Sequence, residues 1–161
     1  MSRFTLRRSQ MIADTFLKLT DIDGEAKDAT HKGEIEVLGW KWEATQAGRT
    51  SGSVDVHDLT VTKLVDKATC KLILACFSGT VINEGVLVVR QQEDKPVEYI
   101  KYTLEKVKVR CVKAGSDSDS RGKRVTEDVS FSFEKVKVDY QTEDGKPAGN
   151  MGWNIAENQK Y

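Results

Sequence analysis

The stretch from His57 to Gly79 contains the residue types of a catalytic or metal site: a histidine, two aspartates, two cysteines and a serine. A catalytic histidine needs a carboxylate that reaches and orients its ring. His57 and Asp58 are neighbours, and neighbouring side chains of a strand point to opposite faces. Ser78 comes at the end of a helical pattern and outside any GxSxG motif. The spacing therefore predicts no catalytic residues here.

The other candidates for chemistry are metal and phosphate sites, and the spacing supports neither. His31, His57 and the three cysteines are scattered, with no pattern such as H-x₃-H. The segment 21–25, DIDGE, has its glycine at the fourth position, whereas an EF-hand loop has it at the sixth. The segment 116–120, SDSDS, is typical of a solvated hairpin loop. With no glycine-rich phosphate loop in the sequence, we predict a protein that is not an enzyme and has no cofactor and no metal.

The three cysteines are predicted to be free thiols. An odd count without a CxxC pair is typical of a reducing compartment. Cys70 and Cys76 would lie about 9 Å apart along a helix axis, which is beyond the reach of a disulfide. We expect both to be small apolar side chains of the core.

Most of the chain alternates apolar and polar residues as β-strands do. Between residues 34 and 44, Ile35 and Val37 share one face, while Leu38, Trp40 and Trp42 share the other. Similar strand patterns occupy six further segments: 15–19, 54–65, 85–89, 97–112, 128–141 and 152–155.

The alternation changes phase within the longest of these segments. The three changes lie between Val56 and Leu59, between Leu104 and Val107, and between Phe133 and Val136. One extra residue in a strand makes a bulge, which bends the strand and returns its apolar side to the core. Several bent strands in one small domain favour a mainly β fold of the barrel type over a flat sandwich.

One substantial helix is predicted, with Asp66 as its N-cap and Gly79 as a left-handed C-cap. Its apolar residues recur at helical spacing and also occupy the remaining sides, at Ile73, Leu74 and Phe77. A short helix that is apolar nearly all round needs cover on two sides. We expect the barrel to supply one cover and another subunit the other.

Composition limits the class of protein. The 161 residues suit a single domain, and 25 basic residues balance 25 acidic ones. A neutral chain does not favour nucleic acid as the main partner, because phosphate binding needs a basic excess. The sequence has no apolar run of about 18 residues, so no membrane-spanning helix is predicted.

Residues 1–10, MSRFTLRRSQ, carry three arginines and no acidic residue. A signal peptide needs an apolar stretch after its basic start, and the residues that follow are too polar. We predict a disordered basic extension ahead of one domain over residues 11–161, with an amphipathic membrane anchor as the alternative. The protein is therefore expected to be made in the cytoplasm and to carry no cleavable signal peptide.

Six motifs follow one another between Ala13 and Asn158: FLKL, DGEAKDATHKGEIEVLGWKW, VDVHDLTVTKLVDKAT with ACFSG, VEYIKYTLEKVKV, TEDVSFSFEKVKVDYQ and GWNIAEN. Each motif is weak alone, whereas their ordered combination is specific. This order resembles the Hcp (hemolysin-coregulated protein) family, the tube-forming component of bacterial type VI secretion systems.

The resemblance implies both a fold and an assembly. A small β-barrel with one flanking α-helix would close into a homohexameric ring, and rings would stack into a tube that a contracting sheath expels. Effector proteins would be carried in the lumen and the protein would be secreted with them. The expected partners are further copies of the chain, the effectors, and the sheath and spike proteins of the machine.

Two surfaces of such a ring can be assigned to residues. Lys41 points away from the tryptophans on either side of it and would line the lumen and contact effectors. A solvated lysine without a role is the alternative. Residues 45–53, TQAGRTSGS, are too polar to join the core. The resemblance assigns ring stacking to this loop, through Gln46, Arg49 and Ser51.

The third surface is the helix, where Ile73, Leu74 and Phe77 are expected either at a subunit interface or in packing against the barrel. Two other functional classes stay open, a monomeric ligand-binding β-barrel and an uncharacterised enzyme. Large side chains such as Trp40 and Phe131 compete for one small interior, which disfavours a ligand cavity. No nucleophile, base and orienting group assemble into an enzyme site.

Overall fold

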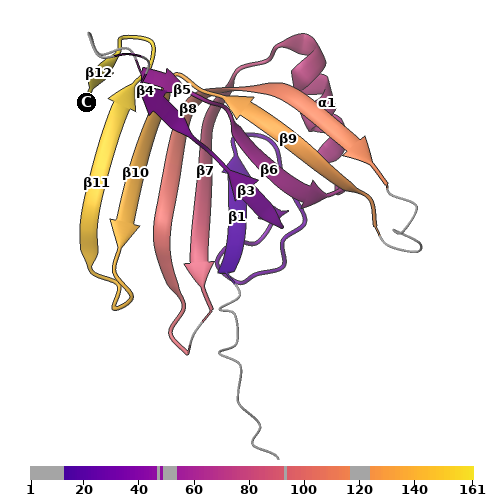
Figure 1. Ribbon diagram of the computed structural model, residues 1–161. Coiled ribbons are helices and arrows are strands. Elements are labelled where there is room, and N and C mark those ends of the chain that lie inside the picture. Colours follow the sequence, from indigo (N-terminus) through magenta and orange to yellow (C-terminus); the bar gives the residue numbers. More distant parts are fainter. Residues whose placement is uncertain (1–12, 47, 49–53, 93, 117–123) are drawn as a thin grey trace, which may run out of the picture.

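The computed structural model describes residues 13–46, 48, 54–92, 94–116 and 124–161, and the predicted extension over residues 1–10 lies outside them. Over these residues the fold is mainly β with one helix, as predicted (Figure 1). The first six strands are β1 (Ala13–Leu19), β2 (Ile35–Val37), β3 (Gly39–Lys41), β4 (Ala44–Gln46), β5 (Val54–Val56) and β6 (Leu59–Leu64). After α1 (Thr69–Ser78) come β7 (Ile82–Gln91), β8 (Val97–Gly115), β9 (Thr126–Ser132), β10 (Lys135–Gln141), β11 (Pro147–Asn154) and β12 (Gln159–Lys160).

The strand β8 organises the sheet because it is long enough to serve two sets of neighbours. Its first half pairs with β7 on one side and with β10 on the other. Its second half pairs with β9, and β9 continues the sheet to β6 and β3. The sheet thus has two branches that meet at β8, one through β7, β1 and β2 and the other through β9, β6 and β3. The strands β10, β11 and β12 extend the sheet from the first half of β8, at the left of Figure 1.

The two ends of the wrapped sheet, β2 and β3, follow each other directly in the chain. Only Leu38 lies between them, and its backbone N–H donates a hydrogen bond to the Thr62 carbonyl at 2.8 Å. The chain itself therefore joins the two branches around a common core, which gives the barrel-like wrapping predicted from the bent strands. Leu38, which was predicted to share a face with Trp40 and Trp42, is 61% exposed, whereas the two tryptophans are half-buried against the core.

The bulge predicted between Leu104 and Val107 is not present, because β8 stays in register with β7 across these residues. The alternation changes phase instead at Lys106, whose φ of 56° is a left-handed conformation that turns the strand without an extra residue. A register shift of the bulge type follows between Val109 and Cys111, in the pairing with β9. Both features lie where β8 passes from its β7 neighbour to its β9 neighbour.

The other two phase changes are breaks between strands and not bulges. β5 ends at Val56, and β6 begins at Leu59 with different partners. β9 ends at Ser132 and β10 begins at Lys135, on opposite halves of β8. A change of partner strand and a bulge leave the same pattern in the sequence, which is why the prediction failed here.

The helix α1 has one buried side and one exposed side. Leu72 and Ala75 are buried against the barrel, whereas Leu74 is 65% exposed and Phe77 is 84% exposed. The predicted C-cap is confirmed, because Gly79 has a φ of 65°. Cys70 is an exposed free thiol, so its predicted place in the core was wrong.

The N-cap prediction was wrong by two residues, because Ala68 and not Asp66 caps α1. The Asp66 carboxylate accepts a hydrogen bond from the Ala68 N–H at 2.9 Å and shapes the turn before the helix. Within the described part of the chain, no helix has the length and apolar character needed to cross a membrane.

Candidate functional site

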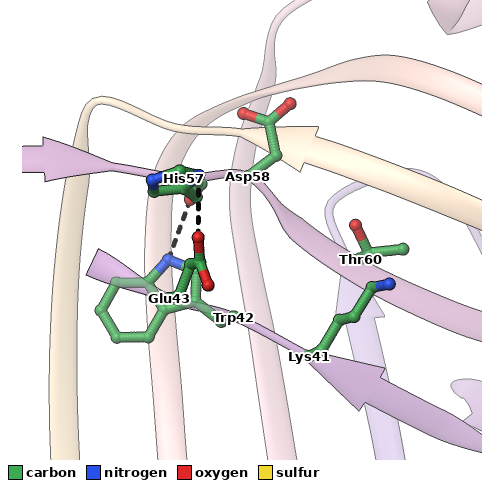
Figure 2. A pocket seen from close by; sticks show the side chains of 6 residues that line it. All are labelled: Lys41, Trp42, Glu43, His57, Asp58 and Thr60. Atoms are coloured by element: carbon green, nitrogen blue, oxygen red, sulfur yellow. Dashed lines mark hydrogen bonds and ion pairs between the residues drawn. The ribbon is translucent and has the colours of Figure 1, made fainter. Parts of the chain in front are cut away.

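A groove of about 590 Å³ opens beside the end of β3 and the start of β6. Figure 2 shows the side chains that line it: Lys41, Trp42, Glu43, His57, Asp58 and Thr60. Lys41 ends β3 and is exposed, and it pairs directly with Thr60 of β6. Trp40 and Trp42 instead pack edge-on against Tyr102, with ring centroids 5.3 and 5.7 Å away. The predicted opposite directions of Lys41 and the two tryptophans are thus confirmed.

The same groove lies at the base of a two-stranded ribbon formed by β4 and β5. The indole N–H of Trp42 donates to the His57 carbonyl at 2.9 Å, and the His57 N–H donates to the Glu43 carbonyl at 3.1 Å. These two hydrogen bonds join residues 42–43, which precede β4, to His57, which follows β5. Trp42 also contacts the barrel wall, so it links the ribbon to the barrel.

The imidazole of His57 lies between two carboxylates of this ribbon. Its Nδ1 is 3.4 Å from Glu43 and its Nε2 is 3.7 Å from Asp55. The sequence prediction considered only Asp58 as a partner of this ring and missed these two carboxylates, because the pairing of β4 with β5 is what brings Glu43 to His57. The contacts close the base of the ribbon.

The predicted stacking residues are only partly described. Gln46 ends β4 and is exposed, while Arg49 and Ser51 lie outside the described residues. Ala44 and Thr45 are exposed too, so β4 contributes nothing to the core. The ribbon pairs only with itself, through three residue pairs, among the described strands.

The three helix residues predicted at an interface or in packing differ in how exposed they are. Ile73 is half-buried at the edge of the contact with the barrel. Leu74 and Phe77 are exposed, and Leu74 lines a pocket of about 230 Å³ together with Val81, which is itself 45% exposed. We call Leu74, Phe77 and Val81 the helix patch. It is an apolar surface on a chain with 31% charged residues.

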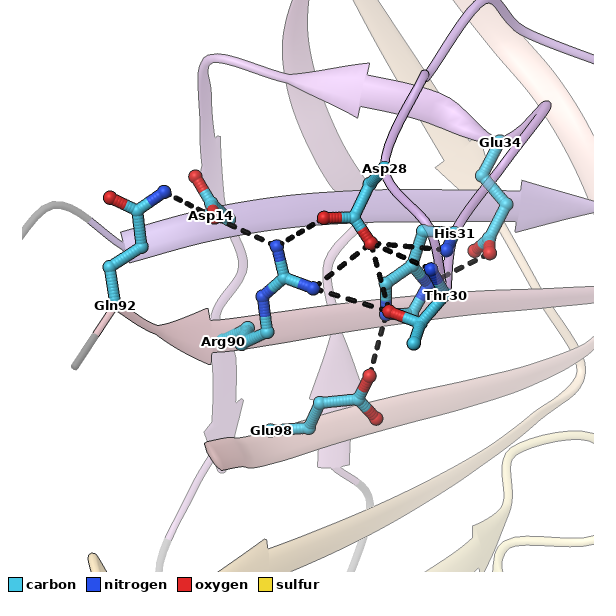
Figure 3. Close-up of polar contacts among 8 residues, drawn as sticks. All are labelled: Asp14, Asp28, Thr30, His31, Glu34, Arg90, Gln92 and Glu98. Carbon is cyan, nitrogen blue, oxygen red and sulfur yellow. Dashed lines mark hydrogen bonds and ion pairs between the residues drawn. The ribbon is translucent and has the colours of Figure 1, made fainter. Parts of the chain in front are cut away.

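A second polar cluster, shown in Figure 3, was not anticipated from the sequence. The Arg90 guanidinium of β7 lies 2.6 Å from Asp28 and 3.0 Å from Asp14 of β1. The hydrogen bond from Arg90, together with one from Thr30, holds the pKa of the Asp28 carboxyl well below its usual range. The Asp28 and Asp14 carboxylates in turn raise the pKa of Arg90. The cluster ties the loop after β1 to the sheet.

His31 completes the attachment of that loop. It is 6% exposed, its Nδ1 lies 2.8 Å from Glu34 and its Nε2 lies 2.6 Å from Glu98 of β8. Its ring stacks on Phe16 with centroids 4.5 Å apart. Among the described side chains, no group of three histidines, cysteines or carboxylates could hold a metal ion. His31 therefore holds the loop after β1 against the sheet.

A third cluster is buried beneath the start of α1. Lys63 and Glu127 are opposite each other in the β6–β9 pairing and are 1% and 2% exposed. Thr69 donates from its hydroxyl to the same Glu127 carboxylate at 2.8 Å. The signal in the sequence was the position of these two charged residues in the strand alternation. Lys63 is two residues from Val61, and Glu127 is two residues from Val129, so each charged side chain points to the same inward side as a buried valine.

Comparison with known proteins connects this geometry to one family. The family model described as "Type VI secretion system effector, Hcp" matches residues 16–140. The chain is 39% identical over 162 residues to Protein hcp1 of Pseudomonas aeruginosa, covering 92% of the chain and 98% of that protein.

Solved structures agree with the sequence match. The crystal structure of Hcp1 from Salmonella typhimurium superposes with a TM-score of 0.80 at 34% identity, covering 94% of this chain and all of that one. A type VI secretion system effector from Yersinia pestis superposes with a TM-score of 0.75 at 28% identity, covering 88% of this chain and all of that one.

Proposed function

Because the chain belongs to the Hcp family of secreted, structural type VI secretion system proteins, we propose that six copies close into a ring and that rings stack into the inner tube of the machine. The observation that carries this proposal is the helix patch. Leu74 and Phe77 expose more than half of their surface to solvent in the single chain. Apolar patches of this kind are typical of protein interfaces.

In a closed ring, the patch of every copy contacts a surface of the neighbouring copy. In a ring of more than two subunits each contact joins two different surfaces, and closure leaves no apolar surface free. We therefore assign the helix patch to the subunit interface and Ile73 to its edge. Leu72, which is fully buried, belongs to the core of the subunit.

Ring stacking is assigned to the ribbon of β4 and β5 with the loop that joins these strands. The described part supports a projecting element, since all three residues of β4 are exposed. Gln46 would contact the next ring, and Arg49 and Ser51 would do so from the same loop. Polar contacts of this kind are weak and salt-screened, which suits rings that separate after delivery.

The wall of the lumen is assigned to the outward side of β3, β6, β9 and residues 108–115 of β8, which we call the polar face. Lys41 lies on this face. In these strands no large apolar side chain is strongly exposed, in contrast to the helix patch. A surface without apolar contacts is suited to remain free inside a ring, where it would meet effector proteins.

We propose that residues 11–161 form one domain preceded by the basic extension 1–10. The protein would be made in the cytoplasm and exported without a cleavable signal peptide. Its partners would be further copies of itself, effectors, sheath and spike, and not nucleic acid or a membrane. It would have no catalytic activity and no cofactor.

The mass of the particle in solution tests the assembly. Light scattering at micromolar concentration should give six times the 18.0 kDa of one chain, and negative-stain images should show rings. A single-chain mass would contradict the proposal and return a monomeric ligand-binding barrel or an enzyme to consideration. Deletion of residues 47–52 should leave the ring mass unchanged and reduce stacking, and unchanged stacking would remove the ribbon from the proposal.

A further inference from the structure

The polar face is an ordered array of hydroxyls and cations. Pairing across the strands places Lys41 next to Thr60, Thr60 next to Ser130, and Ser130 next to Cys111. Directly paired residues of antiparallel strands point to the same side of the sheet. Because Leu59 and Phe131 point into the core from alternate positions, this row points outward.

Three hydroxyl groups of the face form hydrogen bonds with side chains of the same face. Thr60 and Ser130 share a hydrogen bond of 2.9 Å, and Thr62 donates to Asp128 at 2.5 Å. Hydroxyl groups that are already hydrogen-bonded across the strands do not need a hydrogen bond from a ligand. The hydroxyl rows therefore offer a polar surface that other proteins can approach without strong binding.

The cations of the same face have no such partners. Lys41, Lys108, Arg110 and Lys113 are exposed, and none of them forms an ion pair with a described residue. Lys113 is paired in register with Asp128, the one acidic residue that points outward from these described strands. Glu43 and Asp58 line the groove beside Lys41 without an ion pair to it, so the excess of positive charge on this face of a chain with no net charge comes from Lys108, Arg110 and Lys113.

We propose that the polar face selects effector proteins with acidic surfaces and holds them by weak, long-range attraction. This inference rests on the proposed ring, in which six copies of the face would surround the lumen. Charges that line a concave, partly enclosed space raise the local concentration of oppositely charged partners. Six equivalent faces would also act together, so that weak single contacts give useful retention.

The chemistry of the face favours protein over nucleic acid. Proteins that bind single-stranded nucleic acid combine positive charge with aromatic side chains on which bases stack. The outward positions of β3, β6, β9 and residues 108–115 hold no aromatic residue. Attraction without stacking platforms is suited to folded acidic proteins, and it is released as ionic strength rises.

Two triple variants of the full chain test the proposal. The first, Lys41→Gln/Lys108→Gln/Lys113→Gln, removes three cations from the polar face. The matched control removes three exposed cations from the outward side of the other sheet branch: Lys18→Gln/Lys101→Gln/Lys137→Gln. Light scattering first establishes that the wild type and both variants have the same ring mass.

Retention is then measured with two versions of one fluorescently labelled small domain, one with a strongly acidic surface and one with a strongly basic surface. The wild-type ring should retain the acidic probe at about 50 mM salt and release it at about 300 mM. The polar-face variant should bind the acidic probe about tenfold or more weakly, and the control variant should bind as the wild type does.

Each contrary result is distinguishable. Rings that prefer the basic probe, or that lose the acidic probe equally in both variants, would overturn the acidic-cargo inference and leave the ring intact. Rings that bind a labelled single-stranded oligonucleotide more tightly than the acidic probe would overturn it in favour of nucleic acid. A single-chain mass for the wild type would overturn the proposed ring and this inference with it.

Discussion

Lys63 and Glu127 form an ion pair inside the barrel, with Nζ and Oε1 2.5 Å apart across β6 and β9. The remaining contacts of the ammonium group go to Asp66 at 2.8 Å and to the Leu64 carbonyl at 2.9 Å. Burial of a charge is costly unless partners of this kind are present. The pair fixes the register of the two strands beneath the start of α1.

Removal of one partner should therefore be severe. Lys63→Met leaves the buried Glu127 carboxylate without its cation, and we expect a loss of about 3–5 kcal/mol in the free energy of unfolding. Urea unfolding followed by circular dichroism measures this loss. The double variant Lys63→Met/Glu127→Leu removes both charges and should recover much of the stability. A single variant as stable as the double one would show that the ion pair is not what matters here.

The two sides of α1 should respond differently to substitution. Leu74→Lys/Phe77→Lys changes exposed positions, so the subunit should keep its circular dichroism spectrum while the ring dissociates, as measured by light scattering. Leu72→Ala creates a cavity in the core and should cost about 2–5 kcal/mol of stability. A ring that survives the double lysine variant would place the helix patch outside the subunit interface.

Trp42 should control the ribbon of β4 and β5. Trp42→Phe keeps an aromatic ring beside Tyr102 but removes the N–H that donates to the His57 carbonyl, a bond worth about 0.5–1.5 kcal/mol. We expect faster hydrogen exchange in the ribbon and reduced stacking, with unchanged ring mass. The control is Trp40→Phe, at the tryptophan that packs on the same tyrosine. Equal exchange in the two variants would refute a special role for Trp42.

The Asp28–Arg90 contact should make the free energy of unfolding depend on pH in the acidic range. Arg90 lowers the pKa of Asp28 in the folded protein, so this contribution to stability is complete above the unfolded pKa of about 3.9 and is lost as pH falls below it. Asp28→Asn should be less stable than the wild type at pH 7, and the difference should shrink steadily below about pH 4. Thermal unfolding between pH 7 and pH 2 measures it, with the exposed Asp23→Asn as the control. A difference that stays constant across this range would contradict the linkage.

Local pattern was sufficient for much of the fold. Alternation at Ile35 and Val37 predicted a strand and its buried side, and the glycine at position 79 predicted the end of the helix. The opposite directions of Lys41 and its neighbouring tryptophans followed from alternation too. Each of these features depends on residues that are close together in the chain, and the ordered motifs were enough to identify the family.

The tertiary structure decided what depends on partners far away in the sequence. The phase changes after Val56 and Phe133 became strand breaks because the chain changes partner strand there, which no local pattern records. Leu38 became exposed because it lies at the crossing from β2 to β3.

Buried charge and helix orientation were decided in the same way. Lys63 can be buried only because Glu127, 64 residues later, is directly opposite it. A helix that is apolar nearly all round does not indicate which side meets the barrel, and only its packing on the core left Leu74 and Phe77 in solvent. The sequence by itself determined the elements, their directions and the family, whereas the pairing of distant strands determined which charges are buried and which apolar residues are available to another subunit.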